Sequence, residues 1–163
     1  MKTLLILRHA KTQPDAPNGD HARQLTERGH QDAAKMASYI QRQIGTPDAI
    51  ATSDARRAVQ TAEIVADGVG FSTPLTVEPR IYAAAPDTLL DVVRALPGDA
   101  DRVILVGHNP GFEELAEALS SDNEAVRLPT SAFARLEFDV SQWSALQPGS
   151  GQLREVATRH TIS

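Results

Sequence analysis

The sequence contains no cysteine, which excludes a disulfide framework and a zinc site built on thiolates. Positive charge is also scarce, because 16 Lys and Arg residues stand against 21 Asp and Glu, a formal net charge of -5. Nucleic acids and anionic membranes are bound by a positive surface field, so this balance argues against both as partners. Any site for an anion must therefore be a local pocket.

Long apolar runs are missing as well. The apolar stretch from Thr3 to Leu7 is too short for a secretory signal, and charge returns at Arg8. No run is long enough to span a membrane, so we expect a cytoplasmic protein. The length favours a single domain over residues 1–163, which can bury its core without a cofactor.

Short apolar segments alternate with helical patterns, as is typical of an α/β domain. Thr26 is suited to cap the first helix and Ser53 or Asp54 the second, and a polar loop covers Thr12–Asp20. The expected strands are Thr3–Leu7, Asp48–Thr52, Pro74–Val77, Val103–Val106, Phe133–Val140 and Leu153–Thr158. The expected helices are Gly29–Gln43, Ala55–Asp67, Asp87–Leu96 and Pro110–Leu119.

Two of the expected strands end abruptly in a histidine. The first apolar run ends in Arg8-His9, and the run from Arg102 to Gly107 ends in His108. Polar residues at the carboxyl ends of buried strands lie where open α/β sheets place their ligands. This layout suits chemistry on an anion, although a single histidine at a strand end can equally well be structural.

Two further segments suit an anion. Arg56 and Arg57 stand in the opening turn of a helix, where each cation costs about 0.3 kcal/mol or more unless an anion such as phosphate compensates. Helical spacing does not tell which of the two faces a site, and both can simply point into water. The turn from Gly107 to Gly111 offers close backbone approach and free N–H groups at a helix start.

Together these motifs resemble the histidine phosphatase superfamily. Arg8-His9-Ala10 matches the motif that ends the first strand of that family, and Gly107-His108 matches its later Gly-His motif. Ser53 with Arg57-Ala58-Val59-Gln60-Thr61 matches its Ser-x-x-x-Arg-Ala-x-Gln-Thr stretch. The Arg-His-Ala-Lys opening, the segment Arg23-x-Leu25-Thr26-x-x-Gly29 and the segment Gly107-His108-Asn109-Pro110-Gly111 resemble the compact SixA-type phosphohistidine phosphatase branch.

The resemblance implies a phosphoglycerate mutase-like fold, a three-layer α/β/α sandwich around a mostly parallel central sheet. It implies that His9 is a nucleophile that becomes transiently phosphorylated. Arg8, Arg57 and His108 would then surround the phosphoryl oxygens. Arg23, Ser53 and Asn109 are candidate substrate-binding residues, and Arg56 and Lys11 keep no assigned role. No metal ion and no cofactor is implied, because the arginines and histidines supply the positive charge.

A nucleophilic His9 must be a neutral imidazole with one ring nitrogen free. Neighbouring cations help, because they disfavour a further positive charge on the ring. We expect a backbone carbonyl to accept a hydrogen bond from the other ring nitrogen and so to fix the tautomer.

A dedicated proton donor is not evident. The phosphoglycerate mutase and acid phosphatase branches carry a carboxylic acid that protonates the leaving oxygen, and Glu78 is the nearest candidate, outside any recognisable version of that motif. Without a donor an alkoxide leaves poorly, whereas imidazole, whose conjugate acid in histidine has a pKa of about 6.5, leaves far more easily. The sequence therefore predicts a phosphoramidate bond as substrate.

Three functions stay open. The first is a metal-independent phosphohistidine phosphatase acting on a protein, such as a histidine phosphotransfer domain, which short connections and an open pocket would suit. The second is a phosphatase of a small phosphorylated metabolite that uses Glu78, Asp87 or a substrate group as proton donor. The third is a non-catalytic phosphate or phosphoprotein binder, although binding alone would tolerate substitution of His9. Nothing in the sequence identifies the pathway or the oligomeric state.

Overall fold

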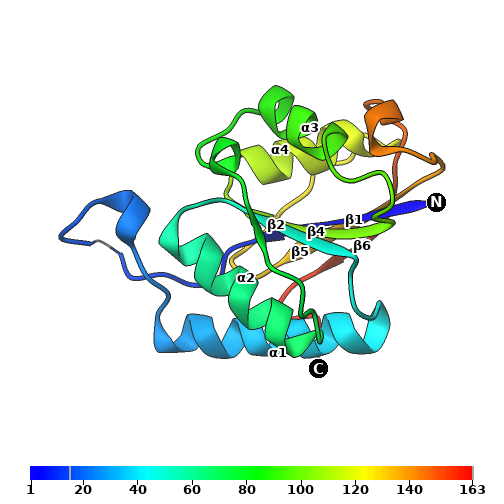
Figure 1. Ribbon diagram of the computed structural model, residues 1–163. Helices are drawn as coiled ribbons and strands as arrows, with labels where there is room; N and C mark the ends of the chain where they lie inside the picture. Colours follow the sequence, from blue (N-terminus) through cyan, green and yellow to red (C-terminus); the bar gives the residue numbers. More distant parts are fainter. Residues whose placement is uncertain (15, 163) are drawn as a thin grey trace.

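A mixed sheet with helices on both faces forms the centre of the molecule (Figure 1). The computed structural model describes residues 1–14 and 16–162, so Asp15 of the expected polar loop and Ser163 lie outside the described residues. The strands are β1 (Lys2–Arg8), β2 (Ala49–Thr52), β3 (Thr76–Val77), β4 (Arg102–Gly107), β5 (Phe133–Phe138) and β6 (Gln152–Ala157). The helices are α1 (Glu27–Gln43), α2 (Arg56–Gly68), α3 (Pro86–Arg94) and α4 (Gly111–Leu119), and short 3-10 turns are η1 (Asp20–Ala22), η2 (Pro79–Ile81) and η3 (Trp143–Ala145).

The six strands lie in the order β3-β2-β4-β1-β5-β6. Pairing is parallel from β3 to β1, and β5 runs antiparallel to both β1 and β6, which confirms the mostly parallel sheet. β1 and β4 are direct neighbours, with Arg8 opposite Gly107. The residues that follow these strands, His9 and His108, therefore leave the sheet side by side at one edge.

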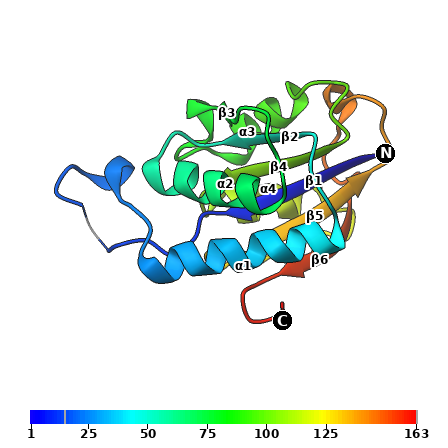
Figure 2. The same ribbon diagram turned by 60° about the horizontal axis from the view of Figure 1, so that its bottom comes forward.

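Alternate residues of the central strands face two helix layers. Leu4 and Ile6 of β1 pack into the core beneath α3 and α4, whereas Leu5 and Leu7 pack against α1 and α2. Figure 1 shows α3 and α4 above the sheet, and Figure 2 brings α1 and α2 forward on the other face. Burial on both faces explains the continuous apolar runs and confirms the three-layer sandwich. Within the described part of the chain, no helix has the length and apolar character needed to cross a membrane.

The expected elements are all present, with ends shifted by one or two residues. Thr26 caps α1 as predicted, since its side chain accepts the Gly29 N–H at 3.0 Å. The predicted cap of α2 is wrong. Its N-cap residue is Ala55, whose methyl side chain cannot accept a hydrogen bond. Helix α4 begins at Gly111, with Pro110 as its N-cap residue. The turn η1, at the end of the expected polar loop, was not predicted.

Two glycines let the first turns of α1 and α4 pack closely against neighbouring backbone segments. A Cβ atom on Gly29 would lie 2.2 Å from the carbonyl oxygen of Lys11, and one on Gly111 would lie 2.4 Å from that of Ala84. Both distances are far below van der Waals contact with backbone atoms, which cannot move aside cheaply. The close approach predicted for the turn after β4 is therefore present at Gly111.

Candidate active site

The two predicted histidines meet at the carboxyl edge of β1 and β4. The ring centroids of His9 and His108 lie 5.3 Å apart with an interplanar angle of 54°. Both residues are largely buried, with exposed fractions of 5% and 9%. The strand register alone brings them this close, because Arg8 and Gly107 are paired immediately before them.

His9 is held as a neutral imidazole with a defined tautomer. Its Nδ1 atom lies 2.8 Å from the backbone oxygen of Ala10, and a carbonyl can only accept, so Nδ1 carries the hydrogen. This confirms the predicted carbonyl partner and leaves the lone pair of Nε2 free. Burial lowers the pKa of His9 to about 3, against the opposing effect of the Ala10 bond, and His108 and the nearby arginines lower it further.

His108 is oriented by Ser53. Nε2 of His108 lies 2.8 Å from Ser53 Oγ, which already accepts the Ala55 N–H at 3.1 Å. The Ser53 hydroxyl can donate to Nε2, which puts the hydrogen of the neutral ring on Nδ1, or accept from Nε2–H in the other tautomer. Burial and Arg57 lower the pKa of His108 to about 4. Nδ1 is buried without a partner among the described residues, and in the tautomer that carries its hydrogen on Nδ1 it is a donor that an anion can use.

These lowered pKa values predict how stability depends on pH. Unfolded histidines bind protons below about pH 6.5, whereas folded His9 and His108 bind them only near pH 3 and pH 4. The stability that their neutral forms contribute is present above pH 6.5 and is lost as the pH falls below it, because the unfolded state then binds more protons. We expect the unfolding free energy of His9→Gln, from urea titrations at pH 7.5 and pH 5, to fall less than that of the wild type. An equal fall in both would contradict the buried neutral ring, and exposed His160→Gln is the control.

Two arginines complete the cluster, Arg57 buried and Arg8 half-buried. Arg57 is 5% exposed whereas Arg56 is exposed, so the residue that the family motif selects is the buried one. Arg57 donates from Nη1 to the backbone oxygen of Asp20 at 2.7 Å, and Arg8 donates from Nη1 to that of Leu128 at 3.2 Å. The Nε atoms of both arginines are buried with no partner among the described residues. Buried donors are rarely left unpaired, so an anion bound between them would satisfy both.

The residues that follow Arg57 explain the rest of the family motif. Thr61 accepts the backbone N–H of Ala10 at 3.0 Å and donates to the backbone oxygen of Arg57 at 2.8 Å. Gln60 accepts the backbone N–H of Leu25 at 2.9 Å. The Gln-Thr pair thus ties α2 to the chain after His9 and to the segment before α1.

The remaining candidates lie around this cluster with different partners. Arg23 donates from Nε to the Asp20 carboxylate at 3.0 Å and from Nη1 to Thr12 Oγ1 at 3.0 Å. Asn109 donates from Nδ2 to the backbone oxygen of Leu128 at 2.8 Å, the same oxygen that Arg8 binds. Asn109 therefore helps to hold the segment that positions Arg8.

Asp20 and Tyr82 also belong to this cluster, and sequence reasoning missed both. The Tyr82 hydroxyl donates to Asp20 Oδ2 at 2.5 Å, and the Tyr82 ring stands edge-on to His108 with centroids 5.4 Å apart. Arg57 lies 6.0 Å from the centre of the same ring. Asp20 comes from η1, at the end of the loop that the sequence describes only as polar, and its spacing of three residues to Arg23 was the one available hint.

Comparison with known proteins agrees with this geometry. The model of the histidine phosphatase superfamily, branch 1, matches residues 4–82, which carry Arg8, His9 and Arg57. Over this stretch, which is just under half of the chain, the protein is similar to the histidine phosphatase superfamily. An uncharacterized protein of Mycobacterium tuberculosis (strain ATCC 25618 / H37Rv) is 28% identical over 156 residues, covering 90% of this chain and 96% of the relative.

Solved SixA structures share the whole fold of this chain. SixA from Agrobacterium tumefaciens superposes with a TM-score of 0.80 at 27% identity, covering 96% of this chain and 97% of that one. The protein histidine phosphatase SixA complexed with tungstate superposes with a TM-score of 0.86 at 23% identity, covering 99% of each chain. The predicted phosphoglycerate mutase-like fold is confirmed. The family match and the shared fold together support a phosphatase that acts on a phosphorylated substrate.

The carboxylates considered as proton donors are paired with another side chain or exposed. Glu78 pairs with Arg80 at 3.0 Å, a contact that lowers the pKa of Glu78, and Asp87 is exposed in the first turn of α3. Asp20 does lie in the cluster, but its bond from Tyr82, assisted by Arg57, lowers its pKa to about 2. Asp20 is therefore ionised at neutral pH and has no proton to give.

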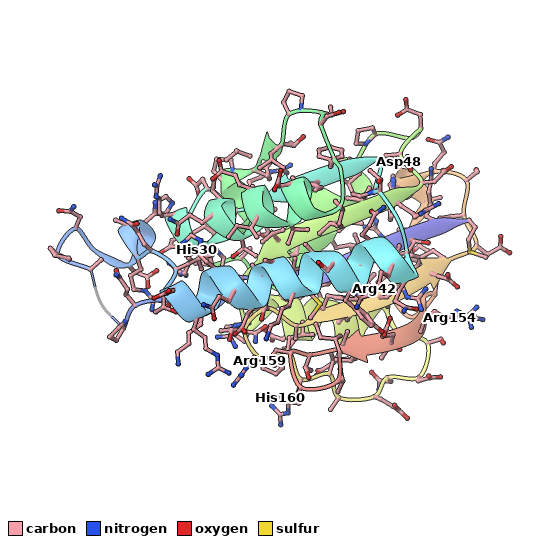
Figure 3. All side chains as sticks on the ribbon, turned by 90° about the horizontal axis from the view of Figure 1, so that it is seen from below. His30, Arg42, Asp48, Arg154, Arg159 and His160 are labelled. Carbon is pink, nitrogen blue, oxygen red and sulfur yellow. The ribbon has the colours of Figure 1, made fainter. Side chains whose placement is uncertain are left out.

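The other histidines lie apart from the cluster or at its rim. Figure 3 places His30 on α1 and His160 beyond β6, and both are exposed. His21 is half exposed, pairs with Asp54 at 3.0 Å and stands edge-on to Tyr82 at 4.9 Å. Across residues 1–14 and 16–162, no group of three or more His, Asp or Glu side chains is placed to hold a metal ion.

Proposed function

We propose that this protein is a metal-independent phosphohistidine phosphatase that acts on a protein. The observation that carries the proposal is the protonation state of the cluster. His9 has a free Nε2 and a pKa of about 3, while the carboxylate of Asp20, which Arg57 and Tyr82 contact, has a pKa of about 2. A neutral nucleophile is available at pH 7, and a carboxylic acid to protonate a poor leaving group is not.

The proposed reaction has two in-line steps. Nε2 of His9 attacks phosphorus, a bond forms between Nε2 and phosphorus, and the bond from phosphorus to the substrate imidazole breaks. The substrate imidazole, protonated on its other nitrogen, departs as a neutral ring. Water then attacks phosphorus, the bond to Nε2 breaks, inorganic phosphate leaves, and His9 returns to its neutral form with the hydrogen on Nδ1.

The cations and N–H donors around His9 stabilise the charge on the phosphoryl oxygens. The unpartnered Nε atoms of Arg8 and Arg57 and Nδ1 of His108 are the donors available. While phosphorylated, the His9 ring carries positive charge, which the Ala10 carbonyl at Nδ1 stabilises. Preorganised donors of this kind need no rearrangement when charge develops, which is the main source of catalysis in phosphoryl transfer.

An open groove beside His108 supports a protein substrate. The groove has a volume of about 430 Å³ and runs along the segments 83–86 and 108–111, with Glu114 as the one acidic residue in its lining. Residues flanking a phosphohistidine fit a groove of this kind. A small phosphorylated metabolite would use only its inner end. The cytoplasmic location and the histidine phosphotransfer partner stay predictions.

Substrate comparison tests this proposal. With a chelator present, the wild-type protein is given a phosphohistidine peptide and an alkyl phosphate of similar size side by side. We expect hydrolysis of the peptide and, at most, slow turnover of the ester. Efficient turnover of the alkyl phosphate with no activity on phosphohistidine would overturn the proposal.

Replacing Ser53 tests the orientation of His108. We expect Ser53→Ala to lower kcat by about tenfold, less than the loss of a direct oxyanion donor, because His108 can then carry its hydrogen on either nitrogen. Nitrogen-15 NMR of the His108 ring reports the tautomer directly and should show Nδ1–H in the wild type. Ser120→Ala removes another buried serine hydroxyl, at the end of α4, and should leave kcat unchanged. An unchanged tautomer in Ser53→Ala would contradict this role.

A further inference from the structure

Asp20 receives several of the hydrogen bonds made by the cations of the site. Its Oδ2 accepts from Arg57 Nη2 at 3.0 Å and from Tyr82 Oη at 2.5 Å, and its Oδ1 accepts from Arg23 Nε at 3.0 Å. Its backbone oxygen accepts from Arg57 Nη1 at 2.7 Å. One residue of η1 thus binds both outer nitrogens of the buried guanidinium.

The direction of these bonds decides which part of Arg57 stays free. A guanidinium has five N–H donors in a rigid plane, so holding Nη1 and Nη2 fixes where Nε points. Nε of Arg57 is buried and has no partner among the described residues. Nη2 carries two hydrogens, and the bond to Asp20 uses one of them. The edge formed by Nε–H and the second Nη2 hydrogen therefore stays open, and such an edge binds two oxygens of a phosphoryl group in parallel.

We propose that Asp20 is a positioning residue for the phosphoryl site, which holds Arg57 so that its Nε edge faces the transferring group. The carboxylate does this while lying between the like charges of Arg57 and Arg23, which would otherwise repel one another. Tyr82 supports the carboxylate from the side of His108. The expected effect on kcat rests on the proposed function, whereas the contacts between Asp20 and Arg57 do not depend on it.

The alternative role for Asp20 is to hold η1 in place without orienting Arg57. A second contact made by η1 provides a matched control for this alternative. Nε2 of the neighbouring residue His21 lies 3.0 Å from Asp54 Oδ1, and this contact links η1 to the segment before α2 without touching Arg57. Asp54→Asn therefore loosens the same segment and keeps the Asp20 contacts. Asp20→Asn keeps a carbonyl oxygen for Arg57 but weakens the bonds from Arg23 and Tyr82.

Kinetics with a phosphohistidine peptide give the first test. We expect Asp20→Ala to lower kcat by about 30-fold, since misplacing a catalytic group by about 1 Å costs up to a hundredfold. KM should change by less than about threefold, because Arg8 and His108 still bind the phosphoryl group and a nearby negative charge has been removed. Asp20→Asn should recover part of kcat, and Asp54→Asn should match the wild type. A kcat of Asp20→Ala within twofold of the wild type, or an equal loss in Asp54→Asn, would overturn the proposal.

An activity-independent measurement separates this inference from the proposed function. The Nε–H resonance of Arg57 is followed by NMR as tungstate, an oxyanion probe, is added. We expect the resonance to shift on binding in the wild type and in Asp54→Asn, and to shift much less in Asp20→Ala. An equal shift in Asp20→Ala would overturn the positioning role. A wild type that shows the Arg57 shift but leaves phosphohistidine intact would instead refute the proposed function alone.

Discussion

His9→Ala is expected to abolish hydrolysis of a phosphohistidine peptide, with kcat falling by about 10⁴-fold or more, as removal of a covalent nucleophile does in other enzymes. The physical reason is that Nδ1 of His9 carries the hydrogen that faces the Ala10 carbonyl, which leaves the lone pair of Nε2 free to attack phosphorus at neutral pH. Arg8, Arg57 and His108 would still bind the phosphoryl group, but none of them can accept it. KM should therefore change far less than kcat.

The loss must be separated from unfolding, because His9 is 5% exposed and its removal leaves a cavity. His9→Gln keeps much of the volume and a hydrogen-bonding end, and should be equally inactive. His30→Ala, at an exposed position of α1, should match the wild type. A folded His9→Gln variant with more than a few per cent of wild-type activity would contradict the nucleophilic role.

Arg57→Ala is expected to lower kcat/KM by about 10²-fold to 10³-fold, the usual cost of removing one donor to a developing charge. Arg57 is buried and its Nε has no partner among the residues that the structure describes, so this donor is available to a bound anion. Arg57→Lys should recover little, because an ammonium group has no planar edge to bind two oxygens and cannot keep both bonds to Asp20. Steady-state kinetics on the phosphohistidine peptide measure both effects.

Arg56 supplies a matched control one residue away. It shares the first turn of α2 and the same charge, but its side chain is exposed. Arg56→Ala should stay within about twofold of the wild type, since surface substitutions rarely perturb a site. Equal losses at the two positions would show that net positive charge, rather than the oriented guanidinium of Arg57, matters to the reaction.

The layers of the fold and the meeting of the two histidines could be predicted because both depend on local patterns. Leu4 to Leu7 are apolar without alternation, which indicates a strand covered on both faces. Strands of that kind deliver their carboxyl ends to one edge, so the proximity of His9 and His108 follows from topology. The choice of Arg57 over Arg56 needed the family motif, since helical spacing does not distinguish them.

Other parts of the site could not be predicted, because they depend on contacts distant in the sequence. Asp20 meets Arg57 and Tyr82 across 37 and 62 residues. The path of the loop before η1 sets those contacts, and no periodic pattern encodes it. Ser53 or Asp54 was predicted to cap α2, but the N-cap residue is Ala55, and Ser53 Oγ accepts the Ala55 N–H and contacts His108 just after β4.

The phosphoenzyme tests the central claim most directly. Wild-type protein mixed with a phosphorus-32-labelled phosphohistidine peptide is quenched within milliseconds in alkali, where phosphohistidine persists, and digested for mass spectrometry. We predict an acid-labile phosphate on the peptide that contains His9, absent from His9→Gln. A wild type that hydrolyses the substrate with no acid-labile phosphate on His9 at any time, or a phosphate carried by another residue, would contradict the account.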